Sequence, residues 1–71
     1  MKHYKATFDN INITYYRTFE INPIKVKNSA IKDRVIHLNI YKNANTNIKE
    51  QRKHLTEFKI ITELEFQNKT L

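Results

Sequence analysis

Two segments near the N-terminus alternate apolar and polar side chains, and only a short polar turn separates them. The apolar residues are Tyr4, Ala6 and Phe8 in segment 2–9, and Ile13, Tyr15, Phe19 and Ile21 in segment 12–21. A repeat of two residues is typical of a strand with one buried face. Because Asp9-Asn10 is a turn pair, the sequence predicts a β-hairpin with both apolar sets, including Phe8 and Phe19, in the core.

The middle of the chain is interrupted at Asn22-Pro23, since proline cannot donate to a sheet and pushes the preceding residue towards extended geometry. We expect a short edge strand at 24–26 after this break. Residues 28–33 are a polar link that could form one helical turn. Residues 34–41 then alternate again, which predicts a further strand with Ile36, Leu38 and Ile40 inward.

The C-terminal part contains a helix start signal. Asn47 is followed three residues later by Glu50, the spacing of a capping box, so a helix is predicted over 48–56. Residues 58–66 alternate once more and predict a last strand. One long helix over 48–66 is the alternative.

These elements predict one small basic domain, 1–71, of the α+β class. We expect a mainly antiparallel sheet of three to five strands, in the order β-β-(β)-β-α-β, with one helix packed on one face. A chain this short buries only about 60% of its surface and has no cysteine to crosslink it. A homodimer or an obligate partner is therefore weighed evenly against a monomer.

Several classes of function lack their sequence signals. The chain has no glycine, so the usual phosphate-binding loops, dinucleotide fingerprints and nucleophile elbows are absent. Its three histidines lie on different predicted elements without metal-ligand spacing. No apolar run is long enough to cross a membrane. We therefore expect no enzymatic activity, catalytic residue, metal or cofactor, no membrane contact, and a cytoplasmic location.

The charge is strongly positive, with thirteen Lys and Arg against seven Asp and Glu and a net charge of +6. Eleven of the thirteen cations lie in residues 1–56. This asymmetry favours a polyanionic partner, either nucleic acid or an acidic protein surface. The alternative is that lysine serves only solubility in a chain whose Asn, Ile and Lys all use A/T-rich codons.

The predicted contact surface combines rings and cations from the outward face of the sheet and from the helix. Its residues are Lys5, Tyr16, Arg34, His37, Tyr41, Lys49, Arg52 and Lys53. Bases stack on such rings, and such cations contact phosphates. Two alternatives stay open. The helix could be a solvated one with Glu50–His54 and Lys53–Glu57 pairs, and Tyr16, Val35, Tyr41 and Ile61 could form a dimer or protein-binding patch.

We therefore expect a small accessory or regulatory binding module that contacts nucleic acid or a nucleic-acid-bound machine. The alternative is an interaction or inhibitor module of the kind that phages and plasmids encode, which docks on an acidic surface or nucleic-acid cleft of a host enzyme. The two targets demand nearly the same charge pattern, so composition does not separate them.

Overall fold

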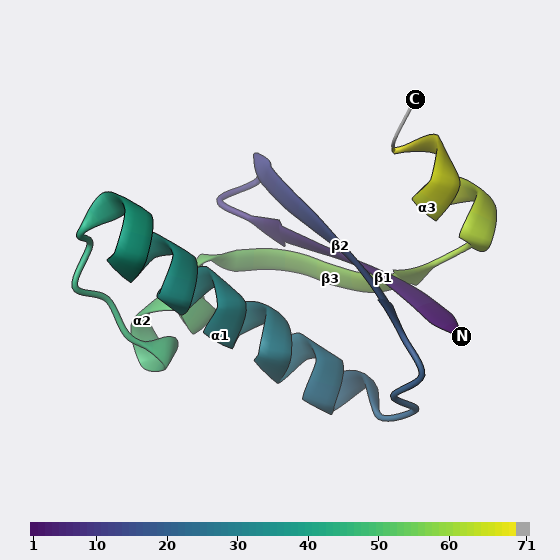
Figure 1. Ribbon diagram of the computed structural model, residues 1–71, viewed down its shortest axis with the longest axis horizontal. Helices are drawn as coiled ribbons and strands as arrows, with labels where there is room; N and C mark the ends of the chain where they lie inside the picture. Colours follow the sequence, from purple (N-terminus) through teal and green to yellow (C-terminus); the bar gives the residue numbers. More distant parts are fainter. Residues whose placement is uncertain (70–71) are drawn as a thin grey trace.

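The computed structural model describes residues 1–69 as a three-stranded sheet with three helices (Figure 1). The elements in chain order are β1 (Lys2–Phe8), β2 (Asn12–Thr18), α1 (Pro23–Lys42), α2 (Ile48–His54), β3 (Leu55–Ile61) and α3 (Glu63–Asn68). The strand order is β2-β1-β3, and both pairs are antiparallel. The predicted α+β class and antiparallel sheet are confirmed.

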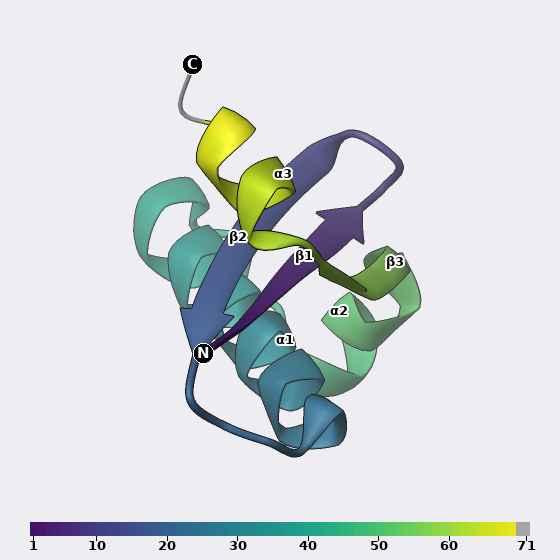
Figure 2. The same cartoon turned by 90° about the vertical axis from the view of Figure 1, so that its right-hand side faces the viewer.

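Strand β1 forms the centre of the molecule because it is paired on both edges and covered on both faces. Tyr4, Ala6 and Phe8 are buried on the face towards α1. Ala6 and Phe8 pack with Ala30 and Ile31 of α1, and Tyr16, Leu55 and Phe58 surround this cluster. His3 and Thr7 are buried on the opposite face. There α3 lies beside the sheet (Figure 2), and the Phe66 ring is 5.0 Å from that of His3.

The hairpin turn is made without glycine. Asp9 and Asn10 both have left-handed backbone, with φ of 55° and 61°, and the Ile11 N–H donates to the Phe8 carbonyl at 3.1 Å. Asn43 and Asn45 are left-handed as well. Asp and Asn tolerate this conformation because their short polar side chains form local hydrogen bonds. The chain thus uses Asp and Asn where other proteins place glycine.

The predicted strands at 24–26 and 34–41 are wrong, because both segments belong to α1. Asn22 caps this helix by accepting the Ile24 N–H at 3.0 Å, and Pro23 occupies the first turn, where its missing N–H costs nothing. The inward side carries Val26, Ala30 and Ile31. Ile36 and Ile40, expected inside a strand, are exposed.

The C-terminal predictions are partly confirmed. The helix begins at Ile48 as expected and ends at His54, and the following strand is β3, which ends at Ile61 rather than at residue 66. A second capping box, Thr62 with Glu65, starts α3. The alternative of one long helix over 48–66 is therefore wrong.

The two faces of β2 are the reverse of those predicted. Tyr16 lies opposite Tyr4 and Thr14 opposite Ala6, and side chains opposite each other on neighbouring strands share a face. Thr14 and Tyr16 therefore face α1, and the apolar row that begins at Ile13 faces away. Phe19, predicted to be core, is 77% exposed.

Within residues 1–69, no helix is both long enough and apolar enough to span a membrane.

Candidate functional site

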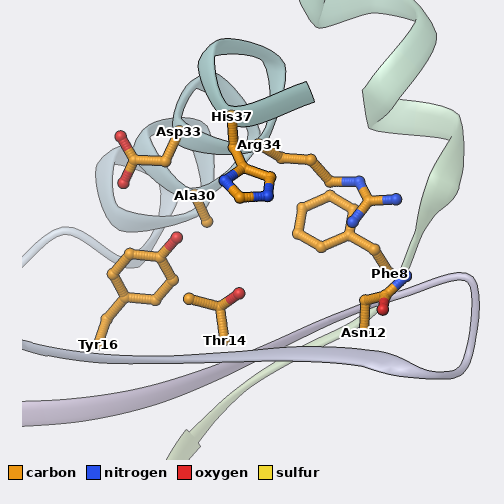
Figure 3. Close-up of a pocket in the computed structure, with 8 residues that line it drawn as sticks. All are labelled: Phe8, Asn12, Thr14, Tyr16, Ala30, Asp33, Arg34 and His37. Atoms are coloured by element: carbon orange, nitrogen blue, oxygen red, sulfur yellow. The ribbon is translucent and has the colours of Figure 1, made fainter. Parts of the chain in front are cut away.

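A cleft of about 430 Å³ lies between β2 and α1 (Figure 3). Strand β2 and the end of β1 form one side of it, and α1 forms the other. Its lining residues are Phe8, Asn12, Thr14, Tyr16, Ala30, Asp33, Arg34 and His37. Three residues of the predicted contact surface, Tyr16, Arg34 and His37, therefore meet here.

Tyr16 and Asp33 lie at one end of the cleft. Burial, followed by the negative charge of Asp33 and a hydrogen bond to it, raises the pKa of Tyr16 from 10.0 to about 12. The phenol is thus neutral at pH 7, and it lies near the Asp33 carboxylate. Beyond this pair a second hollow of about 460 Å³ also lies between β2 and α1, and it shares Tyr16 and Asp33 with the first. The two hollows form one groove, which we call the β2–α1 groove.

Arg34 is held in place by three contacts. Its Nη2 donates to Oδ2 of Asp9 at 3.0 Å, and its Nε donates to Oε1 of Gln51 at 3.0 Å. The guanidinium carbon lies 4.6 Å from the centre of the Phe8 ring. The hydrogen bonds use two of the five guanidinium N–H donors, and the Asp9 carboxylate pairs with the positive charge. Arg34 therefore joins the hairpin turn, α1 and α2.

His37 and Tyr41 lie one helical turn apart on α1, and their rings are 5.0 Å apart. Both side chains are exposed. His37 lines the cleft, so the ring of Tyr41 extends the aromatic surface beyond it.

Helix α2 carries a group of free cations. Lys49, Arg52 and Lys53 are exposed, and their spacing places them on one side of the helix. We call them the α2 cation triad. Within residues 1–69 none of the three forms an ion pair.

The expected Lys53–Glu57 pair does not form, since residue 57 belongs to β3 and Glu57 pairs instead with Lys5, at 3.5 Å. Of the two pairs that would make α2 a merely solvated helix, only Glu50–His54 is present, at 3.6 Å. The triad therefore has less local neutralisation than the sequence indicated.

The eight predicted residues do not form one surface. Lys5 lies opposite Tyr15 and Lys59, on the sheet face away from α1. Strand β2, which forms one wall of the groove, and α2 lie on different sides of α1 (Figure 1), and among the groove residues Arg34 reaches α2 through Gln51. The structure thus separates the predicted surface into the groove with Tyr41, the α2 cation triad, and Lys5.

The sequence reasoning missed Asp33 because it placed 28–33 in a polar link. Had the helix been predicted from Asn22-Pro23 and Asn43, then Asp33, Arg34 and His37 would have shared one helix side. As for metals, no three His, Asp or Glu side chains in residues 1–69 are grouped as a possible metal site.

Comparisons with protein families, with curated proteins and with solved structures find no match to this chain.

Proposed function

We propose that this chain is a small binding module whose target is a nucleic acid, with the α2 cation triad in contact with the phosphates. The observation that carries the proposal is the exposure of Lys49, Arg52 and Lys53 on one side of α2 without an ion-pair partner in residues 1–69. Free cations on one surface release counterions when they meet phosphates, which drives association.

The overall charge supports the same target. A net charge of +6 on 71 residues attracts polyanions at long range. The exposed rings of His37 and Tyr41 offer a second, separate stacking surface at the β2–α1 groove. In this proposal the triad supplies affinity and the rings favour unpaired bases.

The test is fluorescence anisotropy with labelled single- and double-stranded oligonucleotides over a range of salt concentrations. The test variant replaces Lys49, Arg52 and Lys53 with Gln. The control variant replaces Lys2, Lys27 and Lys59 with Gln. These lysines are also exposed, and the two variants have the same net charge because each loses three cations. Loss of three phosphate contacts reduces the slope of log affinity against log salt by about two units on a single strand.

The control variant is expected to keep the slope of the wild type. Equal losses in the two variants would show that net charge alone drives binding and would contradict the role of α2. No binding of the wild type to any oligonucleotide at low salt would contradict a nucleic-acid target.

An acidic protein surface is the second candidate, and the β2–α1 groove favours it. The groove combines apolar walls such as Phe8 and Val26 with the exposed cation Arg17, and a cation complements an acidic partner surface. Pull-down from the native host separates the targets. A protein that stays bound after nuclease treatment supports this candidate, and one that is lost supports nucleic acid.

A further inference from the structure

The two edge strands of the sheet differ in how they are protected. Strand β3 carries Glu57 and Lys59, and its pairing with β1 shifts register at Thr7/Phe8. Charges and bulges of this kind discourage further pairing. Strand β2 has the sequence NITYYRT, with Arg17 as its one charged residue. Within residues 1–69, no backbone group bonds to its outer edge.

Strand β2 and the residues after it also expose an apolar row. Ile13, Phe19 and Ile21 are 46%, 77% and 79% exposed, although they alternate with polar residues as a buried row does. Seven apolar residues form the whole buried core of residues 1–69. This row therefore exposes a large apolar surface for a domain with so small a core.

We propose that β2 pairs antiparallel with β2 of a second copy, around a twofold axis at Tyr16, to give a continuous six-stranded sheet. In this register Ile13 lies opposite the partner's Phe19, Thr14 opposite the partner's Thr18, and Tyr15 opposite the partner's Arg17. Apolar, Thr–Thr and aromatic–cation pairs are all favourable across strands. Tyr16 meets its own counterpart as an aromatic pair at the axis.

The cross-strand pairs favour a twofold axis at Tyr16 over one at Tyr15. A twofold axis at Tyr15 would place Ile13 opposite the partner's Arg17, and it would place the partner's Phe19 opposite Ile11, which lies in the hairpin turn outside β2. With the axis at Tyr16, no two like charges face each other along the strands, even though the chain has a net charge of +6. The edge is therefore complementary to itself, as a twofold interface requires.

The pairing also completes the β2–α1 groove. A twofold axis perpendicular to a continuous sheet keeps both copies of α1 on the same side of that sheet. Since each groove lies between β2 and its own α1, the two grooves meet above the paired strands. The site is then a single, wider cleft with a helix on either side, and each copy contributes Thr14, Tyr16 and His37.

Sedimentation equilibrium of the full chain tests the association, with Ile13→Lys as the disrupting variant and Ile60→Lys as its control. Both isoleucines are exposed and lie on edge strands, so neither change is expected to disturb the fold. A lysine at position 13 faces the partner's Phe19 and weakens the dimer by roughly tenfold or more. The dimer should persist with Ile60→Lys.

Disulfide crosslinking tests the register, since the chain has no cysteine of its own. The double variant Thr14→Cys/Thr18→Cys should form covalent dimers under mild oxidation, and each single variant should form far fewer. A wild type that stays monomeric across micromolar concentrations, or a dimer that Ile60→Lys disrupts and Ile13→Lys does not, would overturn the proposal. Efficient crosslinking by either single variant would overturn the register.

Discussion

Oδ1 of Asp9 lies 2.7 Å from Nδ1 of His54, which joins the hairpin turn to the end of α2 across 45 residues of sequence. The backbone N–H of Asp9 donates to the His54 carbonyl at 2.9 Å, and Arg34 donates to the other carboxylate oxygen at 3.0 Å. Asp9 can make these contacts because its left-handed backbone directs the turn towards α2. One turn residue thus fixes where β3 begins beside β1.

This arrangement predicts a pH dependence of stability. The hydrogen bond to Asp9 is the main cause that raises the pKa of His54 above 6.5, and the charges of Asp9 and Glu50 add to it, while desolvation opposes it. The folded state therefore holds the proton more tightly than the unfolded state. The contribution of the protonated His54 to the free energy of unfolding is complete below about pH 6.5, and it is lost as the pH rises through the raised pKa.

Thermal unfolding of the wild type and of His54→Gln, followed by circular dichroism from acid to alkaline pH, measures this effect. His3 and His37 are present in both proteins, so the difference in Tm isolates His54. We expect the difference to be largest at acid pH. A difference that is constant with pH, or that grows towards alkaline pH, would contradict the role of the Asp9–His54 bond.

The packing around β1 predicts that substitution of one phenylalanine greatly lowers the free energy of unfolding and that substitution of another hardly changes it. Phe8 is 2% exposed and belongs to the core cluster, so Phe8→Ala should lower the free energy of unfolding by about 3–5 kcal/mol. Phe19 is largely exposed, so Phe19→Ala should change it by about 0.5 kcal/mol or less. Urea denaturation at concentrations below any association measures both. Equal losses would place Phe19 in the core of the monomer.

Local signals in the sequence were sufficient for several elements. The capping box predicted the helix start at Ile48, and Asn47 accepts the Glu50 N–H at 2.9 Å. The alternation in the first segment, with the Asp9-Asn10 turn, predicted β1 and the buried side chains of Tyr4, Ala6 and Phe8. These features depend on contacts within a few residues, which a sequence pattern records directly.

Helix α1 could not be predicted from periodicity because its apolar residues surround the helix. Val26 and Ile31 are buried, whereas Ile24, Ile36 and Ile40 are exposed. The run 34–41 therefore matched a strand better than an amphipathic helix. Asn22-Pro23 before it and Asn43 after it are helix capping signals. These signals mark the two ends of α1 correctly, whereas the alternation does not.

The groove depended on a tertiary relationship that the sequence did not define. A slip of one residue in a strand exchanges its two faces, and the alternation alone predicts that the more apolar row of β2 faces inward. In the structure the inward row contains Tyr16, and its partner is Asp33 on α1. This contact requires both the correct face of β2 and the presence of α1.

The Tyr16–Asp33 pair predicts a separate titration of one tyrosine. Phenolate absorbance of the wild type minus that of Tyr16→Phe should rise with a midpoint near the Tyr16 pKa of about 12. Asp33→Asn should lower this midpoint, because the negative charge and the carboxylate acceptor are removed. Burial remains the largest cause, so the midpoint should stay above 10.0. The contribution of the protonated Tyr16 phenol to stability is complete below pH 10.0, and it is lost as the pH rises through about 12.

Thr14→Ser is the matched control for this titration. Thr14 lies on the same face of β2 as Tyr16 and lines the same cleft, but it is not among the causes of the Tyr16 shift. The control should therefore leave the midpoint unchanged. A midpoint near 10.0 in the wild type would show that Tyr16 is neither buried nor bonded to Asp33. A midpoint that Asp33→Asn leaves in place would assign the whole shift to burial and remove Asp33 from the groove's central contact.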